Sequence, residues 1–448
     1  MPYDTERSES STIAPADQAR NVWAFTIDMI LFQIAVTFIS STTVLPAFFT
    51  VLVDSEVAIG VATGLISGAW LLPQLFVASF VSHLTYKKPF MMRGVWLSRP
   101  LFLVMAAIVW LLGRRAPIFV FVFCVVCIFG FFALDATVSV PWFDLMARAL
   151  PDRRRGRIQG TAQVLGGIGA MGVGWLVRYM LSDASRWDFP ANYALLFAAS
   201  SAIFMVSSVF LSLIREPEPQ QSVQDRPSVR QVLASLPRIL MEDRPFLNMI
   251  VVRILSGFVS VASAFYVLYA TKELGFLAQD TGFFISAQVA GSVTSGLLMG
   301  LIQDRWGPLV HMRTTIVLST VSPVLALLAP SVLVVWTDGE LYLFLMIYFF
   351  LGLYMGNIGW PFFNWILEYV EGARRPLYIG MINTLAAMVM LAPTIGGWIV
   401  KTFSYPAVFG VALFFSLAAF LLAIPLPDTR ASSRTEKDSS PGPRPVSS

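Results

Sequence analysis

The sequence has 448 residues, of which 56% are hydrophobic and only 13% are charged. This balance excludes an ordinary soluble globular protein, in which about a quarter of the residues carry charge. The net charge of +4 comes from basic residues that are scattered over separate polar loops, so no nucleic-acid-binding surface is predicted. We therefore expect an integral membrane protein embedded in a lipid bilayer.

Twelve apolar runs follow one another along the chain, and each is long enough for a transmembrane helix, which needs about 20 residues. A polar segment, residues 1–20, precedes them. The runs form two sets of six, near 23–47, 56–83, 93–112, 117–142, 158–180 and 192–213, and near 246–271, 279–302, 310–331, 340–367, 377–400 and 405–425. We predict an N-terminal six-helix bundle over 21–213, a linker over 214–245, a C-terminal six-helix bundle over 246–426 and a disordered tail over 427–448.

Basic residues are unevenly distributed between the two sides that these spans define. About 23 Lys and Arg residues fall on one side and about six on the other, and the positive-inside rule assigns the richer side to the cytoplasm. We therefore expect a multi-pass protein of the plasma membrane (the cell inner membrane). The N-terminal segment, the linker and the tail would all lie in the cytoplasm.

The two sets of spans are related by an internal repeat. A shift of about 220 residues superposes them, which is a test for transporters built by duplication. The shift places PWFD at 141–144 on PFFN at 361–364, DMI at 28–30 on NMI at 248–250, and Arg93 on Arg313. One register that holds at three separated sites indicates a duplicated membrane bundle.

The loop between the eighth and ninth spans, Gly300–Arg313, is short and charged. Gly300, Asp304, Arg305 and Gly307 occur in the order G-x-x-x-D-R-x-G, and Arg313 closes the loop. Glycine allows close backbone packing, and the arginines favour the cytoplasmic side. Together with the repeat, this pattern resembles the signature loop of the major facilitator superfamily.

The resemblance implies an all-α integral membrane protein with 12 transmembrane helices in two pseudo-symmetric six-helix bundles. In such proteins spans 1, 4, 7 and 10 line a central cavity, with span 3 behind them, and the cavity opens alternately to each side of the membrane.

Small residues are concentrated in spans 2 and 11. Gly60, Gly64 and Gly68 lie four residues apart, so they share one helix face and allow another backbone to approach closely. Span 11 contains APTIGG at 392–397, which resembles the family's A/G-P-x-x-G-G antiporter motif. Span 5 is also rich in small residues, and we expect all three spans to provide packing surfaces. The glycines of span 5 are Gly160, Gly166, Gly167, Gly169, Gly172 and Gly174.

Four ionisable residues lie within apolar spans, where charge is costly and therefore functionally suggestive: Asp28, Arg99, Asp135 and Arg253. Each is six or seven residues from the expected cytoplasmic end of its span, or about 9–11 Å deep, so the four could form one layer. One interpretation makes Asp28 or Asp135 a proton-coupling carboxylate. The other pairs Arg99 with Asp135 and Arg253 with Asp28, as structural pairs or as a gate.

Polar and aromatic residues on spans 1, 7 and 10 are the predicted substrate-cavity set. Pockets for organic ligands combine aromatic walls with a few placed polar groups. The alternative is that the small polar residues bond between helices and the aromatic residues belong to interfacial belts. The set comprises Gln33, Thr37, Ser40, Tyr266, Tyr354, Asn357, Trp360 and Asn364.

Enzymatic and cofactor-binding motifs are not predicted. Cys124 and Cys127 form a C-x-x-C pattern inside an apolar helix, without the polar setting or second pair that a redox or zinc site needs. Only two histidines occur, and no nucleotide-binding G-x-x-x-x-G-K-[ST] loop is present. We therefore expect no catalytic residues, no metal and no cofactor.

The sequence thus predicts a secondary transporter of a small organic solute that works by alternating access. Sparse, nearly balanced charge in the spans favours a neutral or amphipathic solute, and the family resemblance suggests export in exchange for protons. The alternatives are a facilitative uniporter or uptake symporter, and a lipid-moving or solute-sensing membrane protein. We expect the chain to act as a monomer.

Overall fold

The computed structural model describes residues 15–82, 84–150, 152–217, 237–335, 339–370 and 374–430. Regular structure within these ranges is entirely helical, and 12 segments are long and apolar enough to cross a membrane. The fold class expected from the sequence is confirmed. Most of the predicted N-terminal segment, linker and tail lies outside the described residues.

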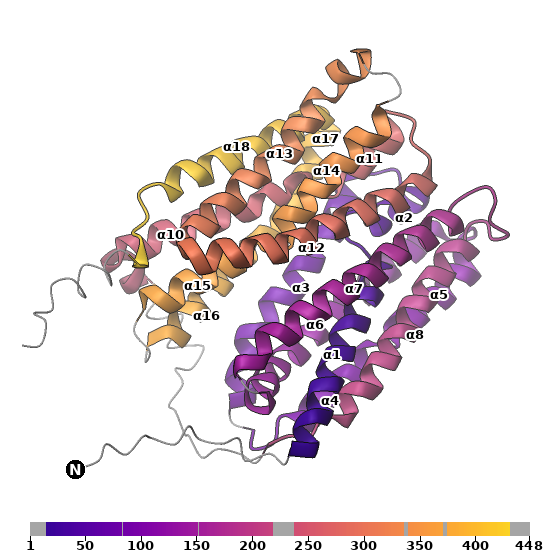
Figure 1. Ribbon diagram of the computed structural model, residues 1–448. Coiled ribbons are helices and arrows are strands. Elements are labelled where there is room, and N and C mark those ends of the chain that lie inside the picture. The colour runs from indigo at the N-terminus through magenta and orange to yellow at the C-terminus, as the bar shows by residue number, and fades with distance from the viewer. Residues whose placement is uncertain are drawn as a thin grey trace, which may run out of the picture. The chain divides into compact units, whose positions relative to one another are not determined.

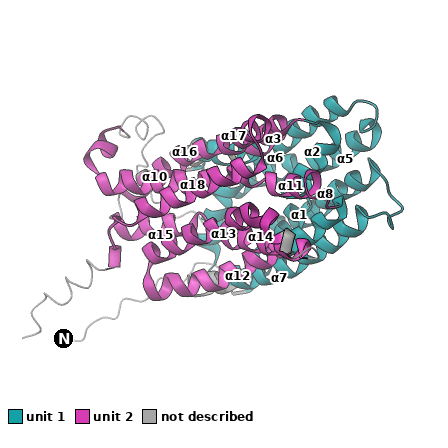
Figure 2. Ribbon diagram, turned by 90° about the horizontal axis from the view of Figure 1, so that it is seen from above, with its two compact units in different colours: residues 1–54, 65–226, 277–286 teal, residues 55–64, 227–276, 287–448 magenta. Residues whose placement is uncertain are grey.

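Packing divides the chain into two compact units, coloured separately in Figure 2. Unit 1 comprises residues 1–54, 65–226 and 277–286, and unit 2 comprises residues 55–64, 227–276 and 287–448. Two helices contribute to both units, α3 (Glu56–Ser82) and α12 (Thr281–Trp306).

Unit 1 contains the helices of the first sequence half. In it α1 packs against α7 and α8, while α4 and α5 pack against α6 and α8. Their bounds are α1 Pro15–Thr37, α2 Val44–Leu52, α4 Lys88–Ser98, α5 Leu101–Leu112, α6 Pro117–Ala149, α7 Asp152–Met180 and α8 Ala191–Leu213, and the short 3-10 helix η2 is Ala278–Asp280.

Unit 2 contains the helices of the second half, in which α13 packs against α14 and α18, and α18 packs against α10 (Figure 1). The α-helices are α10 Arg244–Phe258, α11 Phe265–Lys272, α13 Pro308–Val335, α14 Glu340–Met355, α15 Trp360–Tyr369, α16 Arg375–Ala386, α17 Ala392–Thr402 and α18 Tyr405–Ala423. Two 3-10 helices, η1 Val259–Ala262 and η4 Ala387–Leu391, interrupt them.

Several spans expected to be single helices are interrupted. The helix expected over 23–47 ends at Thr37, and α2 begins at Val44, because the intervening ISSTT segment carries hydroxyls that bond locally, such as Ser40 Oγ to Thr42 Oγ1 at 3.0 Å. The tenth span breaks between Met355 and Trp360, where a GNIG sequence is followed by Pro361, which has no N–H to offer a continuous helix.

Glycines allow helix backbones to touch in unit 2. A Cβ atom on Gly60 would collide with the carbonyl oxygen of Pro393, and one on Gly64 with that of Met390. The close packing predicted for Gly60 and Gly64 of span 2 is confirmed. A Cβ on Gly352 of α14 would likewise collide with the Gln288 carbonyl of α12.

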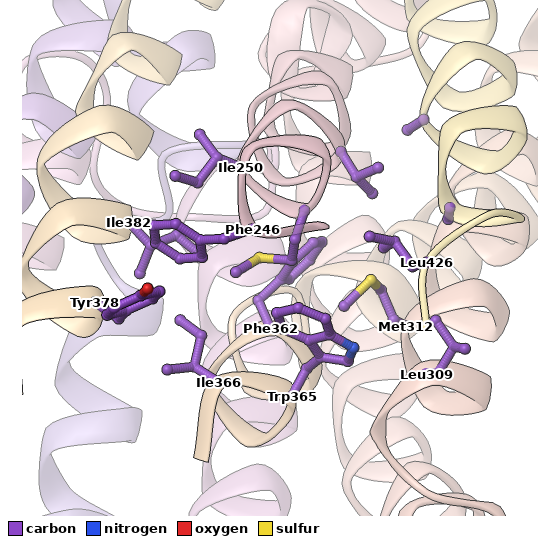
Figure 3. Packing of buried hydrophobic residues seen from close by; sticks show 14 of the residues in the cluster. Phe246, Ile250, Leu309, Met312, Phe362, Trp365, Ile366, Tyr378, Ile382 and Leu426 are labelled. Atoms are coloured by element: carbon purple, nitrogen blue, oxygen red, sulfur yellow. The ribbon is translucent and has the colours of Figure 1, made fainter. Parts of the chain in front are cut away.

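An apolar cluster lies in unit 2 where α10, α13, α15, α16, the C-terminal part of α18 and the segment after it meet (Figure 3). Phe246, Met312 and Trp365 are fully buried within it. The Trp365 indole stacks on Tyr369 with ring centroids 4.3 Å apart, and its Nε1 donates a hydrogen bond to the Pro427 carbonyl. The cluster fixes the position of α15, which carries Phe362 and Asn364.

Polar contacts join the helix ends of unit 1 in what we term the first clasp (Glu216, Arg148 and the start of α4). The Glu216 carboxylate, three residues beyond α8, accepts hydrogen bonds from the backbone N–H groups of Lys87 (2.9 Å) and Lys88 (3.0 Å). It also pairs with Arg148 of α6 at 3.1 Å. Arg148 and Lys87 in turn each lie 2.8 Å from the Asp144 carboxylate.

The second clasp (Glu368, Arg430 and the Asp304 carbonyl) occupies the repeat-related place in unit 2. Arg430, beyond α18, pairs with Glu368 of α15 at 3.1 Å and donates to the Asp304 carbonyl at 3.0 Å. The shift that relates the two halves places Arg148 on Glu368, so the charge on the helix is reversed between the clasps. In each case the partner is a residue that follows the last helix of the half.

Candidate functional site

Polar groups within the spans gather in two regions, one in each unit. The buried-charge region of unit 1 contains Asp28, Arg99 and Asp135, while Arg253 belongs to unit 2. A single layer made by all four residues would join the two units, and it remains a prediction.

Pro100 positions Arg99 in unit 1. Because proline lacks an N–H, it separates α4 from α5, and Arg99 lies at the junction. The carbonyl of Arg99 accepts a hydrogen bond from Ser201 Oγ of α8 at 2.8 Å, so this backbone acceptor is satisfied at the junction.

Arg99 forms a buried ion pair with Asp135 of α6. The Nη1 and Oδ1 atoms lie 3.2 Å apart, and the two side chains are only 1% and 9% exposed. The guanidinium also lies over the rings of Phe204 at 4.6 Å, Phe32 at 5.1 Å and Phe131 at 5.2 Å. The expected pairing of Arg99 with Asp135 is therefore present, and the aromatic faces add a favourable environment for the cation.

Asp28 of α1 is also buried, but the groups that donate hydrogen bonds to it in unit 1 are neutral. Ser207 Oγ of α8 donates to its Oδ1 at 2.5 Å, and the Trp142 indole of α6 donates to its Oδ2 at 3.0 Å. A hydroxyl and an indole can hold this carboxyl whether or not it is ionised. Pairing of Asp28 with Arg253 would again join the two units and remains a prediction.

The polar region of unit 2 lies where two spans lose regular helix geometry. In the seventh span α10 passes into the 3-10 helix η1, and in the tenth span α14 ends before α15 begins. The Tyr354 hydroxyl at the end of α14 donates to the Ser256 carbonyl of α10. Asn357, in the break itself, donates to Ser295 Oγ of α12 at 2.8 Å, and Ser295 Oγ donates to the Leu353 carbonyl at 2.6 Å.

Arg253 lies one turn before Ser256 on α10. Its guanidinium lies over the Phe362 ring of α15, with 5.1 Å to the ring centroid. Among the described residues of unit 2, no carboxylate lies within ion-pair distance of it. The hydroxyl of Ser256 is buried and has no hydrogen-bond partner within the described structure.

Within unit 2, two members of the predicted cavity set lie at the break of the tenth span. Tyr354 and Asn357 share the break region of unit 2, and Tyr266 is buried against Phe409 in a parallel stack at 5.0 Å. Trp360 is 48% exposed and contacts Phe363 edge to face, and Asn364 is partly buried.

The span 1 members of that set lie in unit 1. Thr37 Oγ1 bonds to the Gln33 carbonyl of its own helix at 2.8 Å, and Ser40 bonds within the turn that follows α1. The Gln33 side chain packs directly against Gly166 of α7. The substrate role of the three residues remains a prediction.

Several contacts were not predicted from the sequence. Ser207, Trp142 and Ser295 supply hydrogen bonds that complete the two regions. The only signal for Ser207 and Ser295 is a small polar residue in an apolar span, which many helix-packing serines share.

The signature loop has structural contacts. Arg313 donates to the carbonyls of Ala423 (3.1 Å) and Ile424 (2.7 Å) at the end of α18, and Arg305 stacks on Trp306 at 5.0 Å. Gly307 adopts φ +88°, which favours glycine, whereas a Cβ on Gly300 would meet no described atom within 4 Å. Asp304 contributes its backbone carbonyl to the second clasp.

A cavity of about 540 Å³ lies elsewhere in unit 2, at the ends of α11 and α17. Glu56, Glu273 and Lys401 line it together with Tyr269 and Tyr405. None of the predicted cavity residues borders it. Within the described residues, no group of three or more His, Cys, Asp or Glu side chains is arranged to hold a metal ion.

The sequence matches the model of a known protein family, and the fold matches those of solved structures. The family model described as Major Facilitator Superfamily matches residues 30–390 and again residues 260–448. No curated protein sequence matches the chain.

The fold is similar to that of a D-xylose-proton symporter (TM-score 0.66, 15% identity, 92% of this chain and 98% of that chain). It is also similar to the nucleoside transporter NupG (0.63, 13%, 92% and 98%). A third similar structure is a bacterial homologue of the human lysosomal transporter Spinster, inward-facing and unoccupied (0.60, 13%, 96% and 100%). At these identities the likeness shows the fold alone.

Proposed function

Because the chain belongs to the major facilitator superfamily, we propose that it is a secondary transporter that moves a small organic solute across a membrane by alternating access. Members of this family are transporters rather than enzymes. The chain is a multi-pass membrane protein, and its described residues include 12 helices long and apolar enough to cross a membrane. We further propose that it acts as a monomer in the cell inner membrane, with both termini in the cytoplasm.

The observation that carries the transport proposal is the pair of interrupted spans in unit 2. Irregular backbone at membrane depth is tolerated where it is buried in protein or lines a water-filled cavity. Transporters place their substrate sites at such discontinuous helices. Tyr354 and Asn357 flank or occupy the break of the tenth span, and Ser256 precedes that of the seventh. These residues support a solute site at the two breaks.

Asp28 is our proposed proton-coupling residue. Asp135 has the Arg99 guanidinium as its counter-ion, whereas the groups that contact Asp28 in unit 1 are neutral. A proton that binds to Asp28 removes a buried charge without leaving a cation unpaired, while a proton on Asp135 would leave Arg99 uncompensated. This difference supports solute transport coupled to protons through Asp28, whereas the proposed direction, export, rests on the family resemblance alone.

Proteoliposomes containing the purified protein would test this function. Solutes are first selected by their ability to raise the melting temperature, since a ligand at about 100 times its Kd stabilises the protein by about 2.7 kcal/mol. A selected solute should then move down its gradient and drive proton movement, reported by a pH-sensitive dye inside the vesicles. Asp28→Asn should retain solute exchange and lose proton movement.

The outcomes distinguish the alternatives. Solute movement without proton movement in the wild-type protein would favour a facilitative uniporter, and solute and protons moving together would favour a symporter. Binding without any transport would favour a solute sensor. Scrambling of labelled lipid in the absence of solute transport would favour lipid movement.

A further inference from the structure

We propose that Arg253 and Ser256 bind an oxyanion, so that the transported solute is a small organic anion carrying a carboxylate or phosphate group. This inference rests on the proposed transport function and gives its substrate a chemical class. It departs from the neutral or amphipathic solute that the sparse charge of the spans suggests. Three features support it: an uncompensated cation, an unused hydroxyl and the interrupted backbone around them.

The first feature is the charge of Arg253. A cation within an apolar span is costly unless a counter-ion or water compensates it. Arg99 shows how this chain meets that cost, with an ion pair at 3.2 Å and three aromatic rings. Arg253 has one ring, Phe362, and no carboxylate of unit 2 within ion-pair distance in the described structure. A bound anion would supply what is missing.

The second feature is the hydrogen-bonding capacity of Ser256. Residues three apart on a helix lie on the same face, so Ser256 is next to Arg253 on α10. Ser256 is 1% exposed, and its hydroxyl has no partner among the described residues. Leaving a buried hydroxyl without a partner is unfavourable, because the group has lost its hydrogen bonds to water. A guanidinium and a hydroxyl on one face are donors that a carboxylate or phosphate accepts well.

The third feature is the backbone. The Ser256 carbonyl, next to the transition from α10 to η1, accepts the hydroxyl proton of Tyr354. Since the Tyr354 proton is already donated, we assign Tyr354 a positioning role: it holds the end of α14 against the turn that carries Arg253 and Ser256. The exposed Trp360, directly after the break, offers an aromatic surface for the organic part of the solute.

Matched pairs of solutes test the assignment on the wild-type protein. The probes are aromatic and aliphatic carboxylates and phosphate monoesters, each compared with its own amide or alcohol, in a thermal-shift assay in detergent. Benzoate with benzamide and succinate with succinamide are suitable pairs. We expect the acids to raise the melting temperature more than their neutral counterparts. Phosphatidylglycerol micelles form a separate arm, which shows whether the anion is a lipid headgroup.

Variants then locate the site. Because hydrogen bonds to a charged group contribute about 1.5–3 kcal/mol, Arg253→Gln should weaken acid binding by about tenfold or more, and Ser256→Ala should weaken it less. Arg253→Lys keeps the positive charge, so it should retain part of the affinity for acids. A folded Arg253→Lys variant would also show that the protein tolerates a substitution at this position. The matched control is Arg178→Gln. Arg178 also lies over a phenylalanine ring, that of Phe283 at 4.1 Å, but it is in the last turn of α7 in unit 1 and so is not part of the proposed site.

Three outcomes would overturn the assignment. One is stronger protection by neutral or cationic solutes than by acids, which would leave the transport function intact. Another is acid binding that Arg253→Gln leaves unchanged. A third is that Asp28→Asn destabilises the protein in the absence of solute and that Arg253→Gln reverses this loss, because Arg253 would then have Asp28 as its permanent counter-ion. Failure of every solute to move in proteoliposomes would instead count against the transport function.

Discussion

In the buried ion pair between Arg99 and Asp135, neither charge can be removed alone without a large loss of stability. Taking both ions out of water costs several kcal/mol each, and their attraction in an apolar setting offsets much of that cost. The pair is almost fully buried, so screening by solvent is small. Removing one partner leaves the whole desolvation cost of the other.

Asp135→Asn should therefore destabilise the protein by about 3 kcal/mol or more. The reason is that Arg99 would keep its charge and lose its counter-ion. The measurement is the melting temperature of the detergent-solubilised variant. The double variant Arg99→Met/Asp135→Leu is the control, and it should recover most of the loss. A single variant as stable as the wild type would show that the rings around Arg99 compensate its charge without Asp135.

Gly352 precedes the break in the tenth span and Gly359 is the last residue of the break, and the two make a matched pair. A Cβ on Gly352 would collide with the Gln288 carbonyl, whereas nothing lies within 4 Å of a Cβ on Gly359, whose backbone is in the right-handed helical region. Gly352→Ala should thus cost about 1–3 kcal/mol by forcing α12 and α14 apart. Gly359→Ala should leave the melting temperature nearly unchanged. Equal losses in the two variants would refute the close approach.

At the scale of elements, the two clasps perform the same task with opposite charge arrangements. Each joins the end of a helix from the middle of its half to the segment that follows the last helix of that half. The first clasp uses an acid that also accepts two backbone N–H groups at the start of α4. The second uses a base that donates to a carbonyl of the signature loop. Alternating access by rocking requires that each bundle move as one body, and such contacts support that rigidity.

The clasps should differ in strength. Glu216 has three donors, two of them at a helix N-terminus, and its side chain is 7% exposed, so Glu216→Ala should cost about 2 kcal/mol. The Arg430–Glu368 pair is 38% and 29% exposed, so Glu368→Ala should cost less than about 1 kcal/mol after allowance for solvent screening. Melting temperatures of the two variants in the same detergent would compare them. The reverse order would show that exposure does not control the contribution of these pairs.

At the scale of the whole molecule, the sequence was sufficient to predict the features that depend on composition and on the internal repeat. The twelve spans and the duplication follow from hydropathy and one register, and Arg99–Asp135 could be expected because charge is scarce in these helices. The break in the seventh span and the hydrogen-bond partners of Asp28 could not be predicted from the sequence. Ser207 and Trp142 meet Asp28 only through tertiary packing of α1, α6 and α8, to which the sequence of each helix alone gives no signal.

The exchange of short segments between the two units leads to a last prediction, about motion. Residues 55–64 pack in unit 2 although α3 continues into unit 1, and there Glu56 forms an ion pair with Lys272 at 2.8 Å. If the units move as rigid bodies during transport, α3 must bend or give up these contacts in one state. We expect α3 to stay straight and its first residues to leave unit 2 in one state, so linking Glu56→Cys to Lys272→Cys with a short thiol-reactive cross-linker should stop solute exchange in proteoliposomes, and a cleavable linker should restore it on cleavage. The control is the pair Glu368→Cys and Thr429→Cys, whose native side chains are hydrogen-bonded at 2.6 Å within unit 2, because a link inside one rigid body should leave exchange intact. Full exchange in the cross-linked Glu56–Lys272 variant would mean that the segment moves with unit 2 throughout the cycle and that α3 itself contains the hinge.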